Sequence, residues 1–420
     1  MAAETPVVHL HVGAPKTGTT YLQHLLAANR ESLAGAGVLF PGREWRDQVQ
    51  AAQDVLGHDE GDPRIRAASA GAWERMAAEM LSHRGPAVLY SMEFLSFAGR
   101  EQARRVLDSL RDAEVHVVLT VRDATRTLPA QWQTRVHNGG TETWPEYLAG
   151  AAAAIEEAGN RPRRRGADVP PVTRAFHAAQ GIPRMLRVWG EALPAGRLHV
   201  VTVPGSGADP LLLWRRFAEA VGVDPSLCAQ PPARDNASLG YASAELVRRL
   251  NVALDGVAVS DYNPTLKANL ALKVLAARAR EEPRIPLDRH TRELAATWNR
   301  RVVEAITTSG ADVVGDLADL PQQIVGGAAD DADVDPPAEA QVLDAAAVAL
   351  DGLRRLVRRR VRRLRGLGTT LDVPPAARDK ETPGADRWQS ASDPVHAAVA
   401  ELADLARVAI DLHNQVRERR

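Results

Sequence analysis

The sequence predicts an α/β fold with a three-layer parallel sheet, followed by a helical C-terminal tail. Two observations predict the sheet. Short apolar runs rich in β-branched residues recur along the first half of the chain, and segments of helical periodicity separate them. These runs are mostly apolar rather than alternating, which is typical of parallel strands that helices cover on both faces.

The first expected strand, residues 7–12, leads through the loop Gly13–Thr20 into a helix with one apolar face. Further strands are expected at 38–40, 87–91, 115–121 and 198–203, and helices at 72–84, 100–111 and 210–221. Residues 241–310 are predicted to be mainly helical. Breaks are expected at Asn263–Pro264 and Pro283–Pro286, because proline disrupts the interior of a helix.

Composition divides the chain into three parts. Residues 1–325 are predicted to form the α/β domain, in which the Gly-, Pro- and Arg-rich segment 139–175 is expected to be a lid or substrate-facing excursion. Residues 326–340 are small, acidic and proline-containing, so we expect a linker. Residues 341–420 form the predicted accessory tail, where apolar residues at helical spacing indicate amphipathic helices.

The overall composition limits the classes of function. The 420 residues include 52 basic and 53 acidic ones, and this balance argues against a protein that coats nucleic acid. The single cysteine excludes a disulfide framework, and His9 and His11 have no third ligand nearby, so we expect no metal. No apolar run reaches the roughly 18 residues of a membrane span, and the first residues lack the pattern of a signal peptide. We therefore expect a soluble, cytoplasmic protein.

The loop Gly13–Thr20, with the sequence GAPKTGTT, carries the most specific signal. A strand that leads through a glycine loop into a helix presents backbone N–H groups and the positive helix end to one point, which suits a phosphate. Gly13 and Gly18 are spaced as in a Walker A motif, but Thr19 stands where that motif has its lysine, and Lys16 precedes Gly18 by two positions. Only four of the 52 basic residues are lysines, a bias typical of GC-rich bacterial genomes, so a lysine in this loop is notable.

This loop resembles the 5′-phosphosulfate loop of the PAPS-dependent sulfotransferase family, which has the form P-K-[TS]-G-[TS]-[TS] after the first strand. The resemblance covers about residues 6–255, and the segment that follows residue 198 resembles the C-terminal part of bacterial members. It implies that PAPS, 3′-phosphoadenosine-5′-phosphosulfate, is the sulfuryl donor and PAP the product. It also implies that Lys16 holds the phosphosulfate and offsets the charge that develops on the bridging oxygen. The residues implied to donate hydrogen bonds to the 5′-phosphate are Thr17, Gly18, Thr19 and Thr20.

A second segment extends the resemblance. In the family, an arginine at the end of the strand that corresponds to 115–121 and a serine eight positions later bind the 3′-phosphate of PAPS. Arg122 matches the arginine, whose guanidinium can hold a phosphate through two hydrogen bonds. Ala130 stands in place of the serine, which puts one phosphate contact in doubt. The candidate substitutes for the missing hydroxyl are Thr127, Gln131 and Thr134.

A third segment supplies the candidate general base. Related bacterial sulfotransferases carry a glutamate just after the strand that corresponds to 87–91, and Glu93 stands there in this chain. By the resemblance, Glu93 takes the proton of the acceptor hydroxyl as the sulfuryl group arrives, so it should lie close to Lys16. The alternative candidates are His11, His137 and His177.

The expected function is that of an enzyme, a PAPS-dependent sulfotransferase that acts on a hydroxyl of a small metabolite or carbohydrate by direct in-line transfer. One alternative is a P-loop nucleotide-dependent kinase, in which Asp123 would bind the metal; it needs a lysine at Thr19 that the chain lacks. The other alternative is a non-catalytic family member that binds PAP, PAPS or a protein partner, and Ala130 favours it. The arginine run 354–365 could bind an acidic partner or surface, but we expect it to pack against acidic parts of its own chain.

Overall fold

The structure is a computed structural model that describes residues 5–58, 61–159, 169–230, 238–323, 335–378 and 384–419. Contacts divide the chain into two compact units. The sheet unit comprises Met1–Leu128, Leu148–Asn236 and Arg289–Asp330, and the helical unit comprises Pro129–Tyr147, Ala237–Asp288 and Asp331–Arg420. The tail helices therefore share a unit with residues 237–288, which the sequence analysis placed in the first domain. The predicted linker 326–340 lies mostly outside the described residues, so its role stays a prediction.

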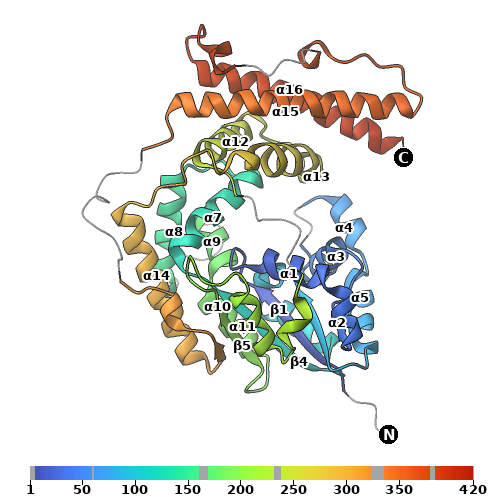
Figure 1. The fold of residues 1–420 in the computed structure, drawn as a ribbon, viewed down its shortest axis with the longest axis vertical. Helices are drawn as coiled ribbons and strands as arrows, with labels where there is room; N and C mark the ends of the chain where they lie inside the picture. Colours follow the sequence, from blue (N-terminus) through green and yellow to red (C-terminus); the bar gives the residue numbers. More distant parts are fainter. Residues whose placement is uncertain are drawn as a thin grey trace. The chain divides into compact units, whose positions relative to one another are not determined.

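The sheet unit is built on six parallel strands in the order β2-β3-β1-β4-β5-β6 (Figure 1). Their bounds are β1 Val7–Gly13, β2 Val38–Leu39, β3 Ala87–Ser91, β4 Glu114–Val121, β5 Leu198–Thr202 and β6 Asp312–Val314. The predicted α/β class and the five predicted strands are confirmed. β6 was not predicted, because this three-residue strand exposes Asp312 and Val313 and so shows no apolar run.

Helices follow most of the strands in the sheet unit. Their bounds are α1 Thr19–Ala28, α2 Arg30–Gly35, α3 Trp45–Leu56, α4 Pro63–Ser69, α5 Ala72–Ser82, η1 Glu93–Phe97, α6 Arg100–Ser109, α9 Pro171–Gln180, α10 Ile182–Gly190, α11 Leu212–Ala220, η3 Pro225–Cys228, α14 Arg289–Ser309 and η6 Leu317–Asp319. Leu22, Leu25 and Leu26 of α1 are fully buried and pack with Phe217 of α11 and with Val118 in one core. The apolar face predicted for the first helix is thus the face that packs on the sheet. The helices α7 Ala124–His137 and α8 Trp144–Gly159 each contribute residues to both units.

The helical unit consists of long helices and shorter turns. Their bounds are α12 Tyr241–Ala253, α13 Val259–Tyr262, η4 Asn263–Val274, η5 Leu275–Arg278, α15 Glu339–Gly366, η8 Pro375–Ala377, η9 Ala385–Trp388 and α16 Pro394–Glu418. α15 and α16 pack against each other along their lengths (Figure 1). The expected break at Asn263–Pro264 is wrong: a π-helix, η4, continues directly from α13. Pro264 is the second residue of η4, so the helix changes from α to π type at this point rather than ending.

The arginine run on α15 is partly buried. Arg354 and Arg360 are both buried, and Arg360 donates hydrogen bonds to Ala409 O at 2.6 Å and to Thr265 Oγ1 at 2.9 Å. Arg354 Nε donates to Ala376 O at 3.2 Å. Arg354 and Arg360 therefore bind carbonyl and hydroxyl oxygens of their own unit. Elsewhere in the run, Arg355 contacts the Asp351 carboxylate and Arg365 lies 3.7 Å from that of Asp372, so part of the run faces acidic groups of its own chain, as expected.

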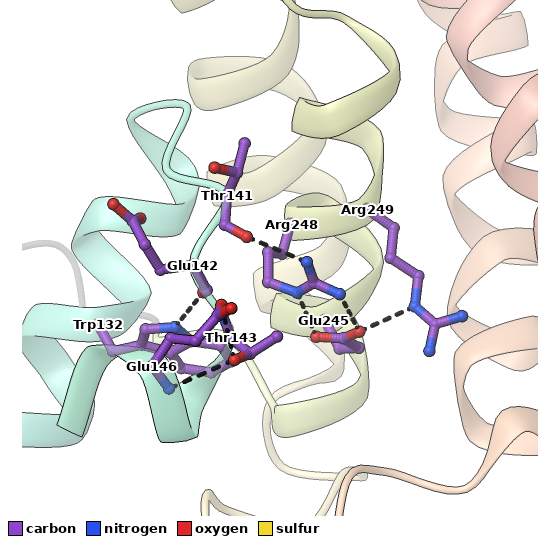
Figure 2. A network of polar contacts seen from close by, with 8 residues as sticks. All are labelled: Trp132, Thr141, Glu142, Thr143, Glu146, Glu245, Arg248 and Arg249. Atoms are coloured by element: carbon purple, nitrogen blue, oxygen red, sulfur yellow. Dashed lines mark hydrogen bonds and ion pairs between the residues drawn. The ribbon is translucent and has the colours of Figure 1, made fainter. Parts of the chain in front are cut away.

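The first part of segment 139–175 is anchored on α12 within the helical unit (Figure 2). Arg248 donates to Thr141 O at 3.0 Å and, through Nε and Nη2, to the Glu245 carboxylate at 2.7 and 2.6 Å. Arg249 Nε reaches the same carboxylate at 2.8 Å. Burial raises the pKa of Glu245, but the hydrogen bonds and charges of the two arginines outweigh burial and hold that pKa below its ordinary value.

A capping box starts the next helix. Thr143 N and Oγ1 donate to Glu146 Oε2 at 2.8 and 2.9 Å, and Glu146 N donates to Thr143 Oγ1 at 3.3 Å (Figure 2). The Trp132 indole of α7 donates to Glu142 O at 2.9 Å, so the turn between α7 and α8 is fixed at both ends. Residues 160–168 of the segment lie outside the described residues, and its lid role stays a prediction.

Candidate functional site

The loop after β1 lies at the point of the sheet where the strand order changes direction. From β1 the chain proceeds to β2 and β3 on one side of β1, and then to β4 and β5 on the other. Parallel sheets bind ligands outside the carboxyl ends of their strands at such a switch point, because the loops diverge there and leave a crevice. Arg122 and Asp123 follow β4 at the same edge of the sheet.

The loop is held in place through its carbonyl groups. Those of residues 13, 14, 15 and 16 each accept a hydrogen bond from a side chain. The donors, in that order, are Thr120 at 3.2 Å, Thr17, Gln180 at 2.7 Å and Arg122 at 3.1 Å. Since these acceptors are bound by the protein itself, the loop backbone is fixed before any ligand arrives.

The N–H groups that follow are available. α1 begins at Thr19 without a side-chain cap, and within the described part of the chain the N–H groups of Gly18, Thr19 and Thr20 donate to no protein acceptor. The first N–H groups of a helix have no partner in the helix itself, and they carry the positive end of its dipole. Lys16, which is half-buried, precedes them by two residues. Free N–H groups and a nearby cation arranged in this way suit an anion.

Two glycines make this geometry accessible. Gly18 has φ 88°, and a Cβ there would lie 2.5 Å from Leu213 Cδ2 of α11. Gly13 has φ 113°, and a Cβ there would lie 3.3 Å from Glu93 Cβ. Only glycine adopts such angles without strain, and only a hydrogen leaves room for these neighbours.

A series of hydrogen bonds between buried side chains connects the loop to the sheet. The hydroxyl groups of Thr17 and Thr120 share a hydrogen bond, His11 Nε2 lies 3.1 Å from Thr120 Oγ1, and His11 Nδ1 lies 2.8 Å from Ser91 Oγ. The chain links β3, β1 and β4, whose residues are all buried here. Burial lowers the pKa of His11 to about 3, so the ring is neutral, with one nitrogen that donates and one that accepts. His11 therefore links the three strands through both of its ring nitrogens.

Glu93 lies beside Gly13 of the loop, and its expected closeness to Lys16 stays a prediction. It begins η1 directly after β3, and its Cβ is the atom nearest to the position that a Cβ on Gly13 would occupy. Gln23 Nε2 of α1 donates to Glu93 Oε2 at 2.6 Å and to Ser91 O at 3.1 Å. Gln23 thus fixes one carboxylate oxygen and leaves Oε1 to act on a ligand.

Arg122 is held at the same edge with part of its bonding capacity unused. Its Nη1 donates to Lys16 O, whereas its Nε is buried and has no acceptor among the described residues. Burial, together with the nearby charge of Arg126, lowers the pKa of Arg122 to about 10. Arg126 is also half-buried, and burial lowers its pKa too. An anion bound here would relieve both the missing hydrogen bond and the repulsion between the two cations.

The Asp123 side chain stabilises the start of α7. Its Oδ1 accepts hydrogen bonds from Thr125 N at 3.0 Å and from Asn299 Nδ2 at 2.8 Å, and its Oδ2 accepts from Thr125 Oγ1. Asn299 Oδ1 in turn accepts from Ala124 N at 2.9 Å, so the pair fixes the first turn of α7. A carboxylate with both oxygens engaged in this way caps a helix.

The remaining candidates are placed as follows. Ala130 lies on α7, and its carbonyl accepts a hydrogen bond from Thr134 Oγ1 at 2.8 Å, so Thr134 is engaged within the helix. Thr127 and Gln131 are buried, and Gln131 Oε1 has no donor among the described residues. The ring of His177 lies 3.6 Å from the Glu157 carboxylate.

Sequence reasoning missed four residues that build the site: Ser91, Thr120, Gln180 and Gln23. They come from four different elements, and no local pattern marks a buried polar side chain whose partner lies far away in the chain. Thr120 in the apolar run 115–121 and Ser91 in the run 87–91 are signals that a search for polar residues in such strands would have found.

Comparisons add no relative: no protein-family model, no curated protein and no solved structure matches this chain. None of the described helices has both the length and the apolar character that a bilayer crossing requires.

Proposed function

We propose that this protein is a PAPS-dependent sulfotransferase that moves a sulfuryl group to a hydroxyl of a small metabolite or carbohydrate. The observation that carries the proposal is the loop Gly13–Thr20. The carbonyl groups of residues 13–16 are bound by the protein, while the N–H groups of Gly18, Thr19 and Thr20 face no acceptor among the described residues. Its likeness to the family's 5′-phosphosulfate loop supplies the identity of the anion. We further propose the three-layer, P-loop-like arrangement that the family shares.

The residues present suit the donor. The N–H groups of Gly18, Thr19 and Thr20, with the Thr17 segment before them, would hold the 5′-phosphate. Arg122 has an unused, buried Nε with which to meet the 3′-phosphate. PAPS, when bound, supplies an activated sulfuryl group on a phosphate leaving group.

The roles of the chain's own residues follow from their placement. Lys16, next to the cradle, stabilises the negative charge that grows on the leaving phosphate oxygen as the S–O bond breaks. Glu93, held by Gln23, accepts the proton of the acceptor hydroxyl through Oε1 as the new S–O bond forms. No proton or electron is left over, because the proton ends on the carboxylate and the charge on the leaving phosphate.

The kinase alternative fits the site less well. It needs a metal-binding acid, and both carboxylate oxygens of Asp123 accept hydrogen bonds that fix the start of α7. It also needs a lysine where Thr19 stands. The non-catalytic alternative is favoured by Ala130, because that position offers no hydroxyl to the 3′-phosphate.

The test compares two ligands by thermal unfolding of the full chain. We expect PAP to raise Tm and ATP with Mg²⁺ to raise it less, since a ligand that binds only the native state stabilises it by mass action. Stabilisation by ATP with Mg²⁺ and none by PAP would overturn the proposal. Stabilisation by PAP without sulfuryl transfer from PAPS to any of a panel of hydroxylated metabolites would favour the non-catalytic alternative.

A further inference from the structure

The helical unit contains a cavity of about 520 Å³, remote in the chain from the loop Gly13–Thr20. Its walls come from the π-helix η4, the short helix η5 and the long helix α15, all within one compact unit. This volume falls in the range of pockets that bind metabolite-sized molecules.

The charged side chains of the cavity are mostly basic. Lys273, Arg278, Arg355 and Arg359 line it, against the single acid Glu281. Two of the cations are already paired with nearby acids: Arg278 lies 3.1 Å from the carboxylate of Glu282, and Arg355 contacts Asp351.

The other two cations have no such partner. Within the described residues, neither Lys273 nor Arg359 makes an ion pair or side-chain hydrogen bond. Both are exposed, and they come from two different helices that line the cavity, η4 and α15. Unpaired cations that converge on one cavity from separate helices favour an anionic ligand.

Apart from Asn269, the rest of the lining is apolar. Val274 and Leu356 contribute side chains from the two walls, and Ala277 and Val348 complete the surface. At Gly352 the helices approach so closely that a Cβ would lie 2.8 Å from the Val274 methyl groups, so a glycine is required there. A surface of this kind holds a hydrocarbon chain or ring, which an inorganic ion would not use.

The π-helix itself points to a ligand. η4 spans 12 residues, whereas most π-helical segments are single turns, and such segments are frequent at functional sites. Lys273 and Val274 follow Asn269 by four and five positions, and all three residues line the cavity. The wider turn therefore places a polar, a cationic and an apolar side chain on one wall.

We propose that this cavity binds a small amphiphilic anion, a molecule with one sulfate, phosphate or carboxylate group on an apolar chain or ring. Lys273 and Arg359 pair with the anionic group, and the apolar part lies against Val274 and Leu356. The site is separate from the loop site, and it stands whether or not the protein is a sulfotransferase.

The first experiment is calorimetric titration of the full chain with three probes. We expect n-octyl sulfate, kept below its micelle concentration, to bind saturably at one site. Inorganic sulfate lacks the chain and octyl glucoside lacks the charge, so each should bind at least about tenfold more weakly. Absence of binding by octyl sulfate, or equal binding by inorganic sulfate, would overturn the proposal.

Variants locate the site. The double variant Lys273→Gln/Arg359→Gln should weaken octyl sulfate binding about tenfold or more, and Ala277→Trp, which places a ring in the cavity at an exposed position, should do the same. Arg362→Gln is the matched control, since Arg362 is exposed on the same helix and does not line the cavity.

Each outcome of these titrations either supports or overturns the proposed site. Loss of affinity in both cavity variants, with the control unchanged and Tm retained, supports the site. Equal loss in Arg362→Gln would indicate attraction to the arginine-rich helix in general and would overturn the proposal. Binding to vesicles of acidic lipid without binding to monomeric octyl sulfate would also overturn it, in favour of a membrane surface.

Discussion

Acidification from pH 7 to pH 5 should destabilise this protein strongly, because two histidines of β1 are buried in neutral form. The His9 ring packs at a tilt of 36° against the His116 ring, with 5.1 Å between centroids, and His11 packs against Phe217 at the same distance. Burial lowers the pKa of both His9 and His11 to about 3, and for His9 the charges of His116 and His199 add to this effect.

The sign and the size follow from linkage. The unfolded chain binds a proton at each histidine with a pKa of 6.5, whereas the folded chain binds it only near pH 3. The unfolded state therefore takes up more protons as the pH falls below 6.5, and the free energy of unfolding decreases down to about pH 3. Between pH 7 and pH 5 each histidine contributes a loss of about 2 kcal/mol, so the two together remove about 4 kcal/mol from a stability that is typically about 5–15 kcal/mol.

Urea denaturation at half-unit steps from pH 5 to pH 8 measures this loss. The Glu114 side chain does not interfere, since its hydrogen bond to His116 and the charge of Arg197 hold the pKa of Glu114 below its usual range. The variant His9→Leu should lose about half of the pH dependence. It breaks no hydrogen bond, because the buried Nδ1 of His9 has no partner among the described residues.

The exposed His58→Leu serves as the control for the substitution itself. A free energy of unfolding that stays flat between pH 7 and pH 5 would refute the reasoning. So would a His9→Leu variant with the same pH dependence as the parent.

Three further predictions concern the loop site. Gly18→Ala should lower the free energy of unfolding by roughly 1–3 kcal/mol and abolish PAP binding, because an alanine is strained at φ 88° and its Cβ clashes with Leu213. Gly57→Ala is the control for the backbone angle alone, since Gly57 has φ 65° and a Cβ there would meet nothing within 4 Å. Ala130→Ser should tighten PAP binding by roughly 1–3 kcal/mol in calorimetry, and an unchanged affinity would mean that no hydroxyl is missing there. Lys16→Ala should impair both PAP binding and turnover, whereas Glu93→Gln should keep PAP affinity and lower turnover by about 10²–10⁴-fold; full turnover in Glu93→Gln would remove Glu93 from the mechanism.

Local sequence was sufficient to predict the parts of the molecule that local physics governs. Helices cover the strands 87–91 and 115–121, so these strands consist mostly of consecutive apolar residues, which the sequence shows directly. The same holds for α15, where Leu353, Val357, Val361 and Leu364 recur at helical spacing and are all buried. The loop Gly13–Thr20 could be predicted because its glycines, Lys16 and threonines are consecutive in the chain between a strand and a helix.

The tertiary structure alone decided which distant side chains meet at that loop. Gln180 reaches Pro15 O from α9, Thr120 reaches Gly13 O from β4, and Gln23 fixes Glu93. Each contact joins residues about 70 to 165 positions apart, or depends on the strand order that places β1 between β3 and β4. Hydrogen bonds of this kind have no periodicity in the chain, because they depend on where the folded backbone places two groups. For the same reason, the pairing of η4 with α15 that forms the cavity could not be predicted from either segment, although the sequence marked both as helical.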